Sequence, residues 1–529
     1  MTARTLAVGG TTYPLILPNI RDPRLHVASV VITIHILGQV VLGFHVSIPQ
    51  ILAAILTCAV IEISLTFRQT RSFVWPASAM LTGSGVALIL RVVGTPAGEP
   101  WYTSGWYIFA GVAGLSLMTK YWIKYHGTHV FNPSNIGLVV AFIVLGNAII
   151  EPLDFWWAPL GGPMLAAYAV IVTGGLLITR RLRLLGLAAA FWVTLAIGVG
   201  ILAASGHSMT TNWAFAPVSG FDFWRVIVTS PEVLIFLFFM ITDPKTTPGG
   251  QVGRVTFGVM VAIASTLLMA PQTNEFGTKV GLLAGLVVVC AARPLLDRVL
   301  PEPKSAADDL RRFGRGLATG GTGAGALRGV ARIGVIATSV LVIGVGIVAA
   351  GSPARGLVVP DMTEKLNGVP HAVDPGTFPA ITVSQQVTDF DHTLAGPGSQ
   401  AVLLALAENL ELENQAMQRK DDSILTAVDH GDRLKEMRSG LEAATASGRT
   451  VLSHFQFDSV HVTLIVPFGV QTGVSIGFDS KGTVIEETYD AAGQLQSRTS
   501  APFAQTFAMR QATGSRWLTV ALLPPGTGS

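Results

Sequence analysis

The chain has 529 residues, half of them hydrophobic and 13% charged, with a formal net charge of +3 and a mean hydropathy of +0.54. The charge is uneven: residues 1–350 hold 23 basic and 13 acidic side chains, and residues 351–529 hold 12 and 19. The two cysteines, Cys58 and Cys290, both precede residue 351, which excludes a disulfide in the last part and a cysteine-cluster metal site anywhere.

Apolar stretches of close to 20 residues are candidate spans of a hydrocarbon layer about 30 Å thick. Residues 1–25 precede the first stretch and are too long and proline-rich for a cleavable signal. We expect eleven spans, near 26–45, 49–67, 76–93, 105–123, 133–150, 163–179, 184–205, 226–242, 255–271, 278–296 and 331–350.

The distribution of basic residues predicts the orientation of these spans. With the N-terminus inside and the spans alternating, the inner segments before residue 350 hold 20 Lys and Arg residues and the outer ones hold three. Such a bias is a strong positive-inside signal. It predicts a multi-pass protein of the plasma membrane with a cytoplasmic N-terminus and an extracytoplasmic C-terminal part. Because the basic residues lie in inner loops, a nucleic-acid-binding surface is not indicated.

Residues 297–330 are predicted to be a flexible inner linker between a membrane core, 26–296, and the eleventh span, 331–350. Its glycine-rich run at 319–325 lacks the Lys-Ser/Thr and the preceding strand of a phosphate-binding loop.

Residues 351–529 are predicted to form a separate α+β domain. An apolar stripe through Leu403 and Leu410 indicates helices over 384–447, and alternating stretches indicate strands over 450–523 with turns at 479–482 and 490–493. This order is similar to that of the nuclear-transport-factor-like superfamily.

Two polar motifs lie at inner ends of spans. The first, 126–135, ends in Phe-Asn-Pro-Ser-Asn, and the second, 242–248, reads Thr-Asp-Pro-Lys-Thr-Thr-Pro. The first opens a helix, whose free N–H groups favour anions, and the second closes one. The three-residue spacing of His126 and His129 is interpreted as an interfacial pair, because no third metal ligand follows. The predicted ligand-binding residues are Asn132, Pro133, Asn135, Thr242, Asp243, Pro244, Lys245, Thr246 and Thr247.

These two motifs resemble those of the NqrB/RnfD family, the membrane flavoproteins of the sodium-pumping NADH:quinone reductase and of the Rnf complex. The resemblance covers roughly residues 20–300 and is carried by Phe-Asn-Pro at 131–133 and Phe-Met-Ile-Thr-Asp-Pro-Lys-Thr at 239–246. It implies a polytopic α-helical membrane protein with an NqrB/RnfD-like core, bound FMN or riboflavin, and electron transfer coupled to ion movement.

The chain departs from that family in two ways. Members with covalent FMN attach it to a threonine in a Ser-Gly-Ala-Thr-like motif, which is absent between residues 135 and 242. The nearest candidate anchors are Thr210 and Thr211 in Ser-Met-Thr-Thr at 208–211, and non-covalent flavin is favoured over attachment to either. The extra span and outer domain resemble a subfamily encoded in enediyne antibiotic gene clusters, often labelled UnbU-like.

Two acids within predicted spans, Glu232 and Glu62, are candidates for an ion or proton path, because a charge in the membrane is costly and usually faces a cavity or a partner. Three functions stay open at this stage: a flavin-binding electron-transfer subunit, a transporter or exporter without redox chemistry, and a membrane anchor whose outer domain binds a partner. No catalytic residue is predicted. The chain has no nicotinamide fingerprint or iron–sulfur cysteine set, so a redox role requires a separate reductase chain or biosynthetic partner proteins.

Overall fold

The computed structural model describes residues 3–8, 10–96, 99–153, 162–211, 214, 217–306, 308–313, 326–357, 363–465, 475–511 and 516–528. The chain divides into two compact units. The first comprises Met1–Met209 and Val218–Leu357, and the second comprises Thr210–Pro217 and Val358–Ser529. The glycine-rich run at 319–325 lies outside the described residues.

The first unit is a bundle of helices. Each of the eleven expected segments contains a helix. Its described helices are α1 (Pro23–Val40), α2 (Ile48–Thr70), α3 (Ala77–Ile89), α4 (Trp106–Trp122), α5 (Pro133–Leu145), α6 (Gly162–Arg181), α7 (Leu185–Ala204), α8 (Gly220–Thr229), α9 (Pro231–Ile235), the π-helix η1 (Phe236–Ile241), α10 (Gln251–Met269), α11 (Glu275–Ala291), α12 (Arg293–Val299), α14 (Ala326–Ala350) and the short 3-10 helix η2 (Ser352–Ala354).

Among the described residues, six of these segments are long and apolar enough to cross a membrane. They are α1, α2, Met164–Arg181 of α6, α7, the run Gly220–Ile241 and α10. The pair α11 and α12 is bent by 56° and would make a seventh span if continuous. The apolar segments α3, α5 and Thr338–Ala350 are shorter. The architecture is therefore that of a polytopic helical membrane protein with six candidate spans.

Two of the short helices end on a buried β-ladder. α3 and α5 have 13 residues each, a length of about 20 Å at 1.5 Å per residue. β4 (Leu90–Val92) and β7 (Ile150–Pro152) follow them and pair antiparallel. Their partners Arg91 and Glu151 form a buried ion pair at 3.1 Å. The ladder satisfies the backbone hydrogen-bonding groups of both segments inside the protein, where non-helical backbone is tolerated in membrane proteins.

Small residues allow neighbouring helices of the first unit to approach closely. A Cβ added to Gly137 of α5 would lie 1.7 Å from Ser116 Oγ and 2.9 Å from Ser116 Cα in α4. One added to Gly285 of α11 would lie 2.5 Å from the backbone nitrogen of Ser265 in α10. Membrane helices associate through such contacts because lipid tails supply no hydrophobic driving force between them.

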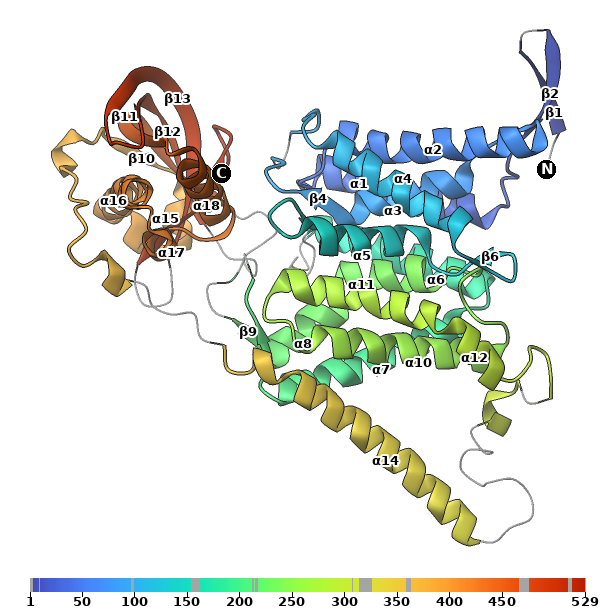
Figure 1. Ribbon diagram of the computed structural model, residues 1–529. Coiled ribbons are helices and arrows are strands. Elements are labelled where there is room, and N and C mark those ends of the chain that lie inside the picture. The colour runs from blue at the N-terminus through green and yellow to red at the C-terminus, as the bar shows by residue number, and fades with distance from the viewer. Residues whose placement is uncertain are drawn as a thin grey trace. The chain divides into compact units, whose positions relative to one another are not determined.

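The ends of the bundle separate the loops into two groups. The N-terminal hairpin β1 (Ala3–Val8) and β2 (Thr11–Ile16), the hairpin β5 (Lys124–Tyr125) and β6 (Thr128–His129), and α12 lie at one end (Figure 1). β4 and β9 (Val218–Ser219), which pairs with β8 (Ser208–Met209), lie at the other. β3 (Phe73–Val74) adds to β2 in parallel. The first group consists of segments that the charge bias assigns to the inner face.

The second unit is a sheet covered by helices (Figure 1). The sheet order is β10–β11–β12–β13–β14, from Ile381–Val383, Thr450–Ile465, Ser475–Tyr489, Leu495–Gln511 and Trp517–Leu523. The helices are η3 (Thr363–Leu366), η4 (Pro375–Thr377), α15 (Gln385–Phe390), η5 (His392–Leu394), α16 (Pro397–Arg419), α17 (Asp422–Val428) and α18 (Gly431–Ser447). The turn expected at 479–482 is wrong, because β12 continues through it and pairs with strands on both sides.

A bulge divides β11 into two halves. Phe457 pairs with Gly482 and Ser459 with Lys481, which leaves Asp458 as an extra residue in the ladder. Phe455 and Phe457 pack edge-to-face on Phe503 and Phe507, with ring centroids 5.2 to 6.0 Å apart. The aromatic cluster thereby covers the sheet face that forms the main core with α16.

The second unit also buries a group of charges. Arg433 of α18 donates from Nε and Nη2 to the two carboxylate oxygens of Glu413, at 2.9 and 2.5 Å, and both side chains are buried. Arg433 also reaches the exposed Glu436 at 2.9 Å. Burial, and then the neighbouring Glu413 charge, raise the pKa of the Asp429 carboxyl well above its ordinary value. The group therefore places a carboxyl of raised pKa beside an ion pair.

Candidate functional site

A cavity of about 410 Å³ lies in the first unit where α1, α3, α5, α6 and η1 meet. Most of its wall is apolar, and its polar residues include Arg24, His129, Asn132, Ser134, Asp243 and Lys245. Small-molecule sites in proteins have volumes of about 300–1,000 Å³ and combine an apolar wall with a few polar groups. Both predicted motifs contribute to this cavity, although they lie more than 100 residues apart in the sequence.

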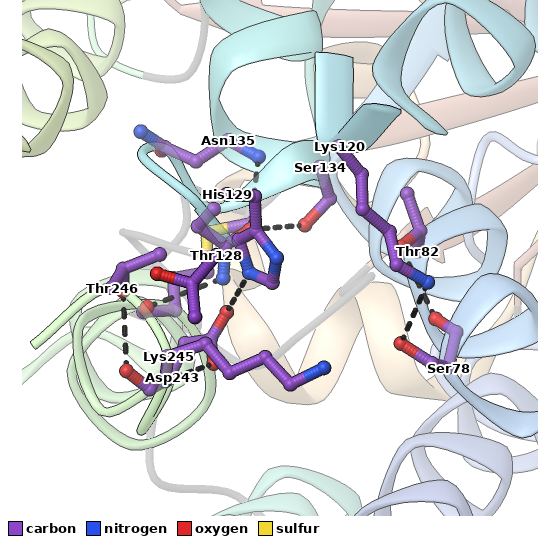
Figure 2. A network of polar contacts seen from close by, with 12 residues as sticks. Ser78, Thr82, Lys120, Thr128, His129, Ser134, Asn135, Asp243, Lys245 and Thr246 are labelled. Atoms are coloured by element: carbon purple, nitrogen blue, oxygen red, sulfur yellow. Dashed lines mark hydrogen bonds and ion pairs between the residues drawn. The ribbon is translucent and has the colours of Figure 1, made fainter. Parts of the chain in front are cut away.

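A contact between the side chains of His129 and Asp243 joins the two motifs. His129 Nε2 lies 3.1 Å from Asp243 Oδ2, with 8% and 20% of the side chains exposed. Figure 2 shows the imidazole of β6 and the carboxylate that follows η1 pointing at one another. The other carboxylate oxygen, Oδ1, accepts the backbone N–H of Lys245 at 3.0 Å. The carboxylate of Asp243 thus orients the second motif towards the first.

Asn132 makes a second link between the motifs. Its Oδ1 caps α5 by accepting from the Asn135 N–H at 3.2 Å and from Ser134 Oγ at 2.9 Å. Its Nδ2 donates to the C=O of Met240 at 3.2 Å. This carbonyl belongs to η1, where the wider π-helical turn interrupts the usual i to i+4 ladder. Asn132 therefore lines the cavity mainly as a rigid connector between two helix ends.

The two motifs divide into residues that line the cavity and residues that support it. Pro133, Thr242, Pro244 and Lys245 are lining residues, and Lys245 is exposed. Asn135 is not; its Nδ2 donates to the C=O of Leu283 in α11 at 3.0 Å. Thr246 and Thr247 are buried behind the turn, where their N–H groups donate to the Asp243 C=O. Three of the predicted ligand residues, Asn135, Thr246 and Thr247, therefore stabilise the helix ends around the cavity and do not line it.

Thr211 and Glu62 are not lining residues either. Thr211 belongs to the segment Thr210–Pro217 of the second unit, where its Oγ1 accepts the Ala214 N–H at 3.2 Å. Glu62 pairs with Lys120 at 3.0 Å and accepts a hydrogen bond from Tyr121. Lys120 also lies 3.5 Å from Ser78, a cavity residue (Figure 2). Glu62 is thereby connected to the edge of the cavity through its lysine.

Glu232 belongs to a buried charge cluster beyond the apolar end of the cavity. Lys279 Nζ lies 3.5 Å from Glu232 and 3.0 Å from Glu275, and all three side chains are at most 14% exposed. The ammonium also donates to the C=O of Leu153 at 3.3 Å. A small cavity of about 30 Å³ beside Glu232 and Lys279 shares Leu88, Ile89 and Ile235 with the large one. Three apolar side chains thus lie between the charges and the ligand-sized space.

The sequence interpretation missed His129 and Lys279 as site residues. The sequence predicts an interfacial pair of His126 and His129, but His129 is buried and only His126 is exposed. The available signal is its position three residues before Asn132, at a helix end that the charge bias assigns to the same face as Asp243. The signal for Lys279 was an acid four residues earlier, Glu275, which on a helix lies on the same face.

The fold and site therefore define a multi-pass helical membrane protein with a ligand-sized cavity and a separate C-terminal sheet domain. No protein-family model and no curated protein matches this chain.

Proposed function

We propose that the first unit binds a flavin, FMN or riboflavin, in the 410 Å³ cavity and transfers electrons within the membrane. The observation that carries the proposal is the convergence of the Phe-Asn-Pro and Thr-Asp-Pro-Lys motifs on that one cavity. The same two motifs carry the resemblance to the NqrB/RnfD membrane flavoproteins. The proposal therefore includes a membrane part with eleven spans. The N-terminus is cytoplasmic, and the second unit is an extracytoplasmic domain of nuclear-transport-factor-like type.

The chemistry of the lining residues fits a flavin. Phe238 and Phe239 and the aliphatic side chains of α1 and α3 offer a wall for a flat aromatic ring system. At the other end, His129 and Asp243 offer hydrogen-bonding atoms for a polar ring edge. The Lys245 ammonium, exposed at the rim, suits a ribityl phosphate. Arg24 is already paired with Asp22 at 2.6 Å, so Lys245 is the favoured phosphate partner.

A bound flavin would supply one- and two-electron chemistry, and the protein would supply position and electrostatics. The hydrogen bonds of Asn132 to both helix ends keep the polar end of the cavity in one geometry. The His129–Asp243 pair places an imidazole and a carboxylate, 3.1 Å apart, at that polar end. The Glu232–Lys279–Glu275 cluster, beyond Leu88, Ile89 and Ile235, is the candidate for coupled proton or ion movement.

Purification of the full chain in detergent tests the proposal. We expect yellow protein whose flavin is released on denaturation, because the attachment is non-covalent. Asp243→Asn should lower flavin occupancy about tenfold, which corresponds to about 1.4 kcal/mol of binding energy. The matched control is Asp222→Asn, a change at an exposed acid of α8 that should leave occupancy unchanged.

Colourless protein that stays colourless after reconstitution with FMN and with riboflavin would refute the proposal. Flavin that remains attached in a denaturing gel, and is lost in Thr211→Ala, would instead show covalent attachment. Size-exclusion profiles and helical circular dichroism establish that each variant is folded.

The same first unit supports one alternative, a transporter or exporter without redox chemistry, associated with natural-product biosynthesis of the enediyne type. The observation that favours it is that the large cavity and the small one beside Glu232 share a wall of three apolar residues, Leu88, Ile89 and Ile235. Proton flux into liposomes, measured with an enclosed pH-sensitive dye, would support it if flavin-free protein conducts and Glu232→Gln does not. The third possibility, an anchor with a partner-binding outer domain, depends on the second unit alone.

A further inference from the structure

The second unit contains a groove of about 450 Å³ along β11. Six consecutive strand residues, 453–458, line it. Successive side chains of a strand point to opposite faces, so a groove that contacts six in a row must follow the backbone edge. The opposite wall is one face of α16, formed by Ala407, Leu410 and Asn414 at helical spacing. The groove therefore lies between a helix and a strand edge.

Within the described part of the unit, no strand pairs with residues 453–458 on this side. β10 pairs only with the other half of β11, from Val460 to Val462, where the Ser384 N–H donates to the Val462 C=O at 2.9 Å. At Ser453 the amide of Asn414 substitutes for a strand: its Oδ1 accepts the Ser453 N–H at 2.9 Å and its Nδ2 donates to the Ser453 C=O at 3.0 Å.

The backbone groups of Phe455 and Phe457 face the same edge as those of Ser453. Alternate residues of a strand turn their N–H and C=O groups to the same side, and the bulge at Asp458 changes this alternation only beyond Phe457. An unpaired edge of this kind is a template for another strand. The open edge therefore presents two successive hydrogen-bonding positions, at Phe455 and Phe457, beside the face of α16 that carries Ala407 and Leu410.

We propose that this groove binds an extended peptide that pairs with Phe455 and Phe457 as an added strand. Strand addition between a sheet edge and a helix is a recurring mode of peptide recognition. At about 3.3 Å per residue, the groove along residues 453–458 is about 16 Å long and accommodates about five peptide residues, which pair with the strand at Phe455 and Phe457.

The lining predicts the composition of that peptide. Phe378 and Leu410 provide an apolar wall, and Glu411 and Asp458 contribute acid groups to the groove. Glu411 lies 3.6 Å from His454, and its side chain remains 30% exposed. The segment 351–529 has seven more acidic than basic residues. We therefore expect a peptide whose apolar side chains alternate with basic ones, as in Lys-Val-Lys-Val-Lys.

Fluorescence anisotropy with the full chain in neutral phosphatidylcholine nanodiscs tests this, with empty nanodiscs as the blank. The probe is labelled Lys-Val-Lys-Val-Lys, and we expect it to bind at least about tenfold tighter than Glu-Val-Glu-Val-Glu. Two further probes are N-methylated at both valines or at the lysines. Only one of these sets faces the edge of β11, so one probe should lose binding about tenfold or more and the other should keep it.

Equal binding of both methylated probes, loss of both, or absence of binding by the parent peptide would each overturn the proposal. Glu411→Gln should weaken binding several-fold, and Glu442→Gln, an exposed acid of α18 outside the groove, should not. Hydrogen exchange gives an independent readout, because bound peptide should slow exchange in fragments that contain residues 453–458. Slowing confined to other strands would contradict the assignment.

Discussion

The buried Glu413–Arg433 pair allows one prediction to be worked out from the structure. Glu413→Gln removes one partner of a bidentate ion pair whose side chains are 5% and 7% exposed. Breaking a buried pair costs about 3–5 kcal/mol, because the remaining charge loses its partner without regaining water. Arg433 keeps the exposed Glu436 at 2.9 Å, so we expect the lower end, about 3 kcal/mol.

Hydrogen exchange of α16 and α18 measures this loss locally in the intact chain. A loss of 3 kcal/mol corresponds to an opening equilibrium more than a hundredfold larger, at 1.4 kcal/mol per tenfold change. Asp422→Asn is the matched control, because Arg438 binds Asp422 with the same bidentate geometry at 2.6 and 2.8 Å while both side chains are nearly half exposed. An exposed pair contributes about 0–1 kcal/mol.

The reasoning would be refuted if the two variants cost the same, or if Glu413→Gln cost less than 1 kcal/mol. Asp429 offers a route to such compensation, because removing the Glu413 charge favours ionisation of this neighbouring carboxyl. Repeating the measurement in an Asp429→Asn background removes this ionisable carboxyl and so excludes such compensation. The double variant Glu413→Met with Arg433→Met should recover most of the loss, since it leaves no buried charge unpaired.

Three further predictions follow from other parts of the chain. Because burial raises the pKa of Asp429 in the folded state, protonation of this carboxyl stabilises the fold. This stabilisation is fully present below the pKa of the unfolded state, about 3.9, and is lost as the pH rises through the pKa of the folded state. Asp429→Asn should therefore flatten a falling stability profile, by up to about 1.4 kcal/mol per pH unit, in denaturant titrations. Gly137→Ala should destabilise the first unit by about 1–3 kcal/mol, because the new methyl would overlap Ser116, whereas Gly111→Ala meets nothing within 4 Å; thermal unfolding in detergent compares them, and equal midpoints would contradict the close approach. Lys279→Met should sharply lower the yield of folded protein by leaving two buried carboxylates without their ammonium, and adding Glu232→Gln should restore part of it; unchanged yield would argue against the cluster.

The sequence predicts which residues share the site where membrane topology alone decides the question. Counting basic residues assigned Asn132 and Asp243 to the same face, and the structure brings both to one cavity. The sequence also predicts that a helix begins after Asn132 and that another ends before Asp243, because a proline follows each of these residues. What the sequence could not supply was the direction of each side chain. Asn135, Thr246 and Thr247 belong to the same motifs, yet helix periodicity and the turn direct them away from the cavity.

Other features were inaccessible because they depend on distant contacts. The position of His129 three residues before Asn132 indicated the residue, but its contact with a carboxylate 114 residues away is encoded in no local pattern. The π-helix η1 has an ordinary apolar sequence, and its wider turn is compatible with the bond from Asn132 to Met240. In the second unit, Asp-Ser-Lys-Gly at 479–482 has the composition of a turn, but neighbouring strands on both sides hold it extended.

The bulge at Asp458 has a consequence for which changes in length the second unit can tolerate. Because the side chains of a strand alternate in direction, deletion of this one residue would invert the orientation of one half of β11 relative to the other. Either Phe455 and Phe457 would turn from the aromatic cluster to solvent, or Val460 and Val462 would leave the core. Substitutions at this exposed aspartate should therefore be harmless to folding, whereas shortening the strand there by one residue should be among the most damaging edits in the domain.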